Sequence, residues 1–250
     1  MKRQVASLIA CLVAAHVHAS EYAAALAWTQ RVVLSTPVSG VVTSVPVVVG
    51  ERVSEGQVLV QLDLRPFESA LRDAEAQARK HRLNRDEAER ELQRTRELYA
   101  RTVISIHDLQ LQEIAFAAAD ADYASALAQL EAARLHLEYA TVRAPFSGLI
   151  LEVPAATGET VVNTQQATPL VTLARDRPMS ARAFVSADAA GALAPGQGVE
   201  VRIAGQTYAG RVVAVGVEPD ADGRYALTVS FDPGDAPLRA GLPAQIDTGR

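Results

Sequence analysis

Pro37-Val38-Ser39-Gly40, Val45-Pro46 and Gly50-Glu51-Arg52-Val53 form a seventeen-residue pattern that returns 108 positions later in the chain. The second copy reads Pro145-Phe146-Ser147-Gly148, Val153-Pro154 and Gly158-Glu159-Thr160-Val161, and eight positions are identical at this fixed offset. After a three-residue insertion, residues 59–62 of the first copy also correspond to residues 170–173 of the second. The chain therefore contains a duplicated segment that is interrupted by a long insert.

Each copy consists of short apolar runs that are separated by glycines and bordered by prolines, which is typical of β-strands joined by tight turns. Neither copy has enough apolar residues to be stable alone, because a small group of strands needs a partner to bury its hydrophobic face. We therefore expect residues 34–63 and 141–174 to combine into one β-sandwich domain.

The insert, residues 64–140, has the composition of helices and contains no glycine. Pro66 is tolerated in a first helical turn, and Asp63 before it is a candidate cap. The helical pattern breaks near Thr102, and Ser105 followed by Asp108 resembles a capping box that starts a second helix. Two helices of about 35 residues would form an antiparallel hairpin about 50 Å long.

Apolar residues recur on the second predicted helix at alternating spacings of three and four, which predicts a narrow coiled-coil seam. We expect this seam to consist of Ile114, Ala117, Ala121, Ala124 and Ala128, with Leu127, Leu130 and Leu137 beside it.

The two helices of the insert differ in charge. Residues 65–101 hold ten Lys and Arg against eight Asp and Glu, whereas residues 106–140 hold one Arg and six acids. Exposed faces of a thin hairpin need charge to stay soluble, which explains the charges in part. The asymmetry is also compatible with neighbouring hairpins ordered side by side in a ring.

The C-terminal part, residues 175–250, returns to strand patterns and predicts a small closed β-barrel. A short helix is expected at residues 187–193, and the sequence Asp-Ala-Asp-Gly at residues 220–223 predicts a hairpin turn. The expected strands cover residues 180–185, 199–203, 207–217, 225–231 and 244–248.

The first nineteen residues resemble an export signal, with Lys2 and Arg3 before a short apolar stretch and small residues before a cleavage point after Ala19. Cys11 lies in a sequence that also fits a lipobox, so acylation at this cysteine is the alternative. Cys11 is the only cysteine of the chain, and cleavage after Ala19 would leave a mature protein without a thiol.

The composition argues against several classes of function. A net charge of −5 disfavours nucleic acid as a partner. Carrier domains of lipoyl or biotin enzymes attach their cofactor to a lysine at a β-turn, but the lysines here are Lys2 and Lys80, outside both β-halves. We find no catalytic motif and no His or Met pattern with metal-ligand spacing. The sequence thus predicts no enzyme, no cofactor and no metal site.

The order of these segments resembles that of periplasmic adaptor proteins, also called membrane fusion proteins or the hemolysin D family. The string Ala140-Thr141-Val142-Arg143-Ala144-Pro145-Phe146-Ser147-Gly148 is close to the family's most recognisable sequence, and the turns at residues 194–197 and 238–242 match those of its barrel. The resemblance implies a mixed α and β, elongated, multidomain fold with a split lipoyl-like β-sandwich, a helical hairpin and a β-barrel.

The family places Arg, Leu and Ser around the tip of its hairpin in the pattern R-x3-L-x6-S, which Arg94, Leu98 and Ser105 reproduce. The resemblance implies that these residues dock on an outer-membrane channel. A purely structural reading stays open, in which Leu98 ends the helical seam, Ser105 is an N-cap and Arg94 is one arginine among many.

The resemblance further implies a periplasmic protein that connects an inner-membrane transporter to an outer-membrane channel and forms a ring of about six copies. A transporter of the resistance-nodulation-division class is favoured, and an ATP-binding-cassette or type I secretion exporter is the alternative. A coiled-coil scaffold without a transport role is the alternative of another class. Many members also have a membrane-proximal domain, for which the sequence shows no clear counterpart, so the contact with the transporter stays open.

Overall fold

The computed structural model describes residues 21–163, 167–234 and 236–249, which form two compact units. One unit covers Arg31–Ala174, and the other combines the chain up to Gln30 with Arg175–Arg250. The chain passes between the units within strand β1 (Glu21–Leu34) and within strand β8 (Val171–Val185). The predicted signal peptide and Cys11 lie outside the described residues.

The duplicated sequence forms duplicated strands in the first unit. Strands β2 (Gly40–Ser44) and β3 (Arg52–Val53) return 108 positions later as β6 (Gly148–Glu152) and β7 (Thr160–Val161). Strand β2 of the first copy pairs with β7 of the second, and β3 of the first pairs with β6 of the second. The two copies therefore exchange strands, and each one completes the sheet of the other.

Hydrogen bonds at the turns repeat the same offset. The amide of Gly50 donates to the carbonyl of Ile150, and the amide of Gly158 donates to that of Val42, both at 2.8 Å. The Glu51 carboxylate accepts from the amide of Val48 at 3.0 Å, and Glu159 accepts from Ala156 at the same distance. The repeated Gly-Glu pair thus closes one turn in each copy, which explains why both residues recur.

One hydrophobic core joins the two copies, as the repeat predicts. Strands β4 (Val58–Leu62) and β5 (Thr141–Arg143) pair with each other, and β8 pairs with β6 up to Ala174. The side chains of Leu59, Leu62, Leu170 and Leu173 are fully buried in this core together with Ile150 and Phe146.

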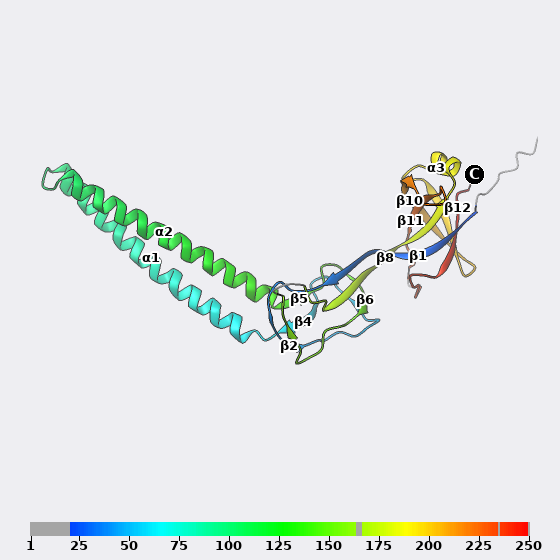
Figure 1. The fold of residues 1–250 in the computed structure, drawn as a ribbon, viewed down its shortest axis with the longest axis horizontal. Helices are drawn as coiled ribbons and strands as arrows, with labels where there is room; N and C mark the ends of the chain where they lie inside the picture. Colours follow the sequence, from blue (N-terminus) through cyan, green and yellow to red (C-terminus); the bar gives the residue numbers. More distant parts are fainter. Residues whose placement is uncertain (1–20, 164–166, 235, 250) are drawn as a thin grey trace, which may run out of the picture. The chain divides into compact units, whose positions relative to one another are not determined.

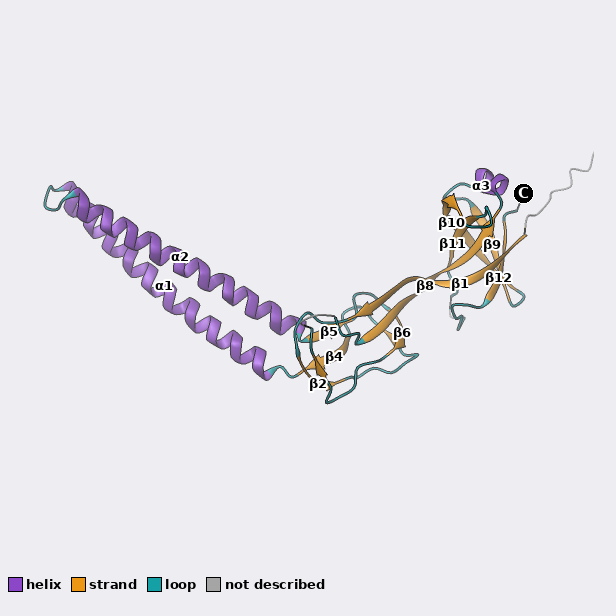
Figure 2. Cartoon of the chain, in the orientation of Figure 1, coloured by secondary structure: helices purple, strands orange, loops and turns teal. Residues whose placement is uncertain are grey.

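Helices α1 (Arg65–Ala100) and α2 (Ile106–Tyr139) form the antiparallel hairpin between the copies (Figures 1 and 2). Ser105 caps α2 with a complete capping box, which confirms the prediction from Ser105 and Asp108. At the start of α1, Leu64 holds the N-cap position without a side-chain bond. Asp63 lies one position before the N-cap, and its carboxylate accepts a hydrogen bond from the amide of Arg65, the first residue of the helix.

The predicted register of the seam was wrong. On α2, the positions turned toward α1 are Leu109, Gln112, Phe116, Ala119, Tyr123, Ala126, Leu130, Ala133 and Leu137. Ala126 and Leu130 pack against Ala74 and Ala78 of α1. The residues that we expected in the seam are all exposed, namely Ile114, Ala117, Ala121, Ala124 and Ala128. The prediction failed because α2 is apolar on two faces, and the spacing alone does not say which face meets α1.

The second unit is a β-barrel with the order β1-β12-β9-β10-β11-β8, and β1 also pairs with β8. Its remaining strands are β9 (Gly198–Ile203), β10 (Gln206–Pro219), β11 (Tyr225–Phe231) and β12 (Pro243–Asp247), and helix α3 (Ala187–Ala192) follows β8. The predicted turn at residues 220–223 joins β10 and β11, and Gly223 has a positive φ of 75°.

Strand β1 was not predicted from the sequence. Its residues Glu21–Ala25 pair with β12, and Leu26 is buried in the barrel core beside partly buried Tyr22, Ala24 and Trp28. Alternating Tyr22, Ala24, Leu26 and Trp28 were a signal for a half-buried strand, but the alanines between them weakened it. The barrel therefore contains an N-terminal strand in addition to the predicted C-terminal ones.

Candidate docking site at the hairpin tip

Both helices are tied to the β-sandwich at the root of the hairpin. The amide of Leu62 donates to the carbonyl of Ala140, and the amide of Asp63 donates to that of Val41, both at 2.8 Å. The Thr36 hydroxyl donates to the carbonyl of Tyr139 at the end of α2, at 2.7 Å. The hairpin therefore leaves the sheet from two anchored points.

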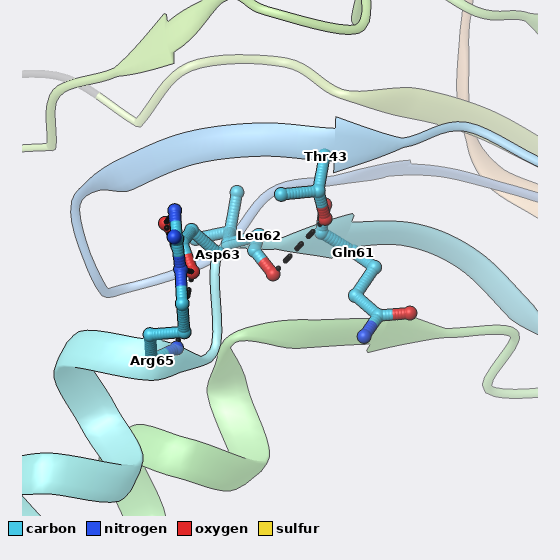
Figure 3. Close-up of polar contacts among 5 residues, drawn as sticks. All are labelled: Thr43, Gln61, Leu62, Asp63 and Arg65. Atoms are coloured by element: carbon cyan, nitrogen blue, oxygen red, sulfur yellow. Dashed lines mark hydrogen bonds and ion pairs between the residues drawn. The ribbon is translucent and has the colours of Figure 1, made fainter.

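Asp63 and Arg65 brace the start of α1 (Figure 3). The guanidinium Nε of Arg65 lies 2.9 Å from Oδ1 of Asp63, and its Nη2 lies 2.5 Å from Oδ2. These hydrogen bonds lower the pKa of Asp63 from 3.8 to about 2. Beside this pair, the Thr43 hydroxyl contacts the carbonyls of Gln61 and Leu62, which fixes β2 against the strand that leads into α1.

A polar layer interrupts the seam in the middle of the hairpin. Arg85 of α1 lies at a seam position, and its Nε donates to Oδ1 of Asp120 on α2 at 2.9 Å. Its guanidinium also lies 5.8 Å from the ring centroid of Phe116. Because an ion pair between helices is satisfied in only one alignment, this layer fixes the register of α1 against α2.

The tip is a short loop between the last residue of α1, Ala100, and Ser105. The amides of Arg101 and Val103 both donate to the carbonyl of Leu98, at 3.2 and 3.1 Å. Thr102 has a positive φ of 59°, which is uncommon for a residue other than glycine and lets the chain reverse sharply. Val103 is 66% exposed and Ile106 is 52% exposed, so the tip presents apolar side chains to solvent.

The structure brings two of the three predicted docking residues to this loop. Ser105 accepts from the amide of Asp108 at 3.2 Å, and its hydroxyl donates to the Asp108 carboxylate at 2.7 Å. The Ser105 hydroxyl and, secondly, the Ser105 amide donate to this carboxylate and lower the pKa of Asp108. Leu98 is half-buried at the last seam position of α1. Both residues therefore have the structural roles that the sequence allowed, since Leu98 ends the seam and Ser105 is the N-cap of α2.

Arg94 lies one helical turn before Leu98 on the same side of α1, and its guanidinium is bonded to Glu91 at 2.6 Å. Val103 and Ile106, which were not among the predicted docking residues, are more exposed than Leu98. The sequence contained a signal for them, because Val103 and Ile106 are apolar residues at the predicted break between the two helices. Apolar residues at such a break cannot pack in the interface between the helices and are therefore exposed.

A protein family described as the CzcB-like, barrel-sandwich hybrid domain matches residues 30–172, more than half of the chain. The chain belongs to this family. The match covers the strand-exchanged β-sandwich and the complete hairpin. This places the chain among membrane fusion proteins, or periplasmic adaptors.

Individual relatives agree with this assignment. The macrolide export protein MacA of Escherichia coli O157:H7 is 29% identical over an alignment of 182 residues, which covers 67% of this chain and 49% of MacA. The multidrug resistance protein MdtA of Yersinia enterocolitica is 26% identical over 148 residues, or 59% of this chain and 33% of MdtA. The CzcB-like chain thus spans about half of MacA and a third of MdtA.

The solved structure of the membrane fusion protein Spr0693 from Streptococcus pneumoniae R6 has the same fold. It superimposes with a TM-score of 0.71 at 18% sequence identity, over 92% of this chain and 99% of that one. Within the residues that the structure describes, no helix is both long and apolar enough to cross a membrane.

Proposed function

We propose that this CzcB-like protein is a periplasmic adaptor that links an inner-membrane efflux transporter to an outer-membrane channel and supports the export of small molecules. The observation that carries this proposal is a helical hairpin whose root is anchored in a strand-exchanged β-sandwich and whose tip exposes Val103 and Ile106. A scaffold without a partner would gain nothing from apolar side chains at its far end. An adaptor needs them, because they provide the contact with a second protein.

The names of the relatives support a proposal for the exported substrate class. One matched protein exports macrolides and another confers multidrug resistance, so we propose amphipathic small molecules as the cargo. For the transporter we keep the resistance-nodulation-division class as the first candidate. The ATP-binding-cassette class is the second, because the likeness to MacA is compatible with it.

For the docking site we propose Arg94, Leu98 and Ser105, extended by the exposed Val103 and Ile106. A helical partner would take the apolar side chains as anchors and the Arg94 guanidinium as a polar contact that fixes the register. A closed channel needs several tips at once, so we further propose that about six copies act together in a ring.

The proposed site of action is the periplasm, with the first nineteen residues as the export signal and Ser20 as the mature N-terminus. Acylation at Cys11 is the second candidate. Mass spectrometry of the exported protein separates the two, because the lipidated form would begin at Cys11 and carry added acyl mass.

Export measured in cells that lack the native gene tests the docking site. Leu98→Asp and Val103→Asp should both abolish export of the substrate, because each places an unpaired charge in the contact with the channel. Leu98 is half-buried in the seam, so Leu98→Asp also weakens the hairpin itself. Val103→Asp is therefore the sharper variant.

The matched control is Val217→Asp, which changes a valine of the barrel that is 92% exposed. This variant should export like the wild type. Circular dichroism should show an unchanged helix content for Val103→Asp and Val217→Asp and a modest loss of helix for Leu98→Asp. Export at the wild-type level from Val103→Asp would rule out the tip as the docking site.

A further inference from the structure

The barrel unit contains a hollow of about 940 Å³ that plays no part in the proposed docking site. Its lining comes from strands β8, β9, β10, β11 and β12 and from the turns that border them, all within one compact unit. Small-molecule sites in proteins typically measure about 300–1,000 Å³. The barrel therefore has room for a ligand of that size.

The hollow lies on the outside of the barrel, over β9 and β10. Gly198 and Glu200 of β9 pair with Arg211 and Ala209 of β10, and all four line the hollow. Val199, between the two β9 residues, is buried in the barrel core. Because neighbouring side chains of a strand point to opposite faces, the four paired residues lie on the outer face.

Small residues create the hollow. Arg211 pairs with Gly198 on one side and with Ser230 of β11 on the other, and Gly249 lines the hollow just after β12. A Cβ atom on Gly198 would meet no other atom within 4 Å. The sheet is continuous here, so the space comes from missing side chains rather than from a gap between strands.

Carboxylates outnumber cationic groups in the lining. Its ionisable side chains are those of Glu200, Asp232, Asp247 and Arg211. The guanidinium of Arg211 is held at the neighbouring turn, because its Nη1 donates to the carbonyl of Gly196 at 3.2 Å. The hollow therefore has an excess of negative charge.

Arg202, which lies outside the lining, neutralises only part of this charge. Its Nη2 lies 2.6 Å from Oδ2 of Asp247, but the same guanidinium also bonds the carboxylate of Glu21. Asp232 accepts a hydrogen bond from the amide of Gly234 at 2.9 Å, and this donor carries no net charge. Negative charge thus remains at the edge of the hollow after these contacts are counted.

We propose that the hollow binds an organic cation with an apolar body. Val213, which is 54% exposed, and the exposed Pro178 supply apolar contacts, while the carboxylates attract the charge. A bare metal ion suits the site less well, because the described part of the chain has no group of three or more His, Cys, Asp and Glu side chains that could hold one. The site goes beyond the proposed function, since a connector between two membrane proteins needs no ligand.

Two probes of nearly the same shape and opposite charge test the proposal. Isothermal titration calorimetry of the mature chain should show saturable binding of tetraphenylphosphonium. Tetraphenylborate should bind about tenfold more weakly or less, because it brings a negative charge to the carboxylates. Equal binding of both probes would overturn the proposal, as would the absence of saturable phosphonium binding.

A bulky residue in the hollow provides the steric test. Gly198→Trp should weaken phosphonium binding by at least about tenfold, because the indole occupies the space of the ligand. The matched control is Gly191→Trp in α3, an exposed glycine outside the lining where a Cβ would likewise meet no atom within 4 Å. Undiminished binding by Gly198→Trp, or an equal loss in both variants, would contradict the site.

A charge variant keeps the test decisive if Gly198→Trp does not fold. Glu200→Gln combined with Asp232→Asn should weaken phosphonium binding by about tenfold and should not weaken borate binding. The control is Glu218→Gln, an exposed residue of β10 outside the lining, which should bind the phosphonium like the wild type. Unchanged phosphonium binding in the double variant would overturn the proposal. These titrations need no partner protein and no export, so their failure and a failure of the proposed function can be told apart.

Discussion

At the scale of single residues, the first glycine shared by both copies of the repeat has two different environments. A Cβ atom on Gly148 would lie 2.2 Å from the backbone carbonyl oxygen of Ala174, which cannot move without disrupting the pairing of β6 with β8. On Gly40, the equivalent position, a Cβ would lie 3.3 Å from a terminal methyl carbon of Leu62, and this side chain can adjust.

Gly148→Ala should therefore destabilise the β-sandwich by about 2 kcal/mol, the usual cost of overpacking. Gly40→Ala should cost clearly less, although the two glycines occupy the same place in the repeat. Urea unfolding monitored by the circular dichroism signal of the β-strands measures the free energy of unfolding of both variants. Equal losses for the two variants would contradict the assignment of backbone contact to Gly148 alone.

Asp63 gives the root of the hairpin a dependence on pH. Its pKa is lowered from 3.8 to about 2 by the bonds with Arg65, so the folded state favours the charged carboxylate. This contribution to stability is fully present above about pH 4 and is lost as the pH falls through about 2. The difference in melting temperature between wild type and Asp63→Asn should therefore shrink between pH 5 and pH 2. A constant difference across this range would contradict the role of the charged pair.

At the scale of elements, the sequence predicted which segments become helices and strands better than it predicted which faces they bury. The turn before Ser105 follows from local chemistry, since a capping box needs only Ser105 and Asp108. The seam does not, because Ile114 and Leu130 are equally apolar and only the position of α1 distinguishes them. Strand β1 was missed for a related reason, because its pairing with β12 joins the two ends of the chain.

The corrected seam can be checked with two neighbouring alanines of α2. Ala126 is 4% exposed and packs against α1, whereas Ala128 is exposed to solvent. Ala126→Asp should destabilise the hairpin by roughly 3 kcal/mol, because it buries a charge without a partner. Ala128→Asp should change the stability of the dilute monomer by less than about 0.5 kcal/mol. Thermal unfolding monitored by helix content measures both, and the opposite order of the two variants would restore the register predicted from spacing.

At the scale of the whole molecule, the arrangement of the repeat explains why the hairpin can serve as a connector. The two copies exchange strands, so the segment between them must leave and re-enter the same small domain. A long hairpin satisfies this requirement with both of its ends fixed by hydrogen bonds to the sheet. Its tip does not pack in the core of the β-sandwich, so the sequence of the tip can change to match a partner without destabilising that core.

Affinity purification of the tagged chain from cross-linked membranes tests the central claim most directly. We predict that the wild-type protein co-purifies with one inner-membrane transporter and one outer-membrane channel. Val103→Asp should retain the transporter and lose at least nine tenths of the channel, while Val217→Asp should retain both. Purification without either membrane protein, or undiminished recovery of the channel with Val103→Asp, would contradict the account.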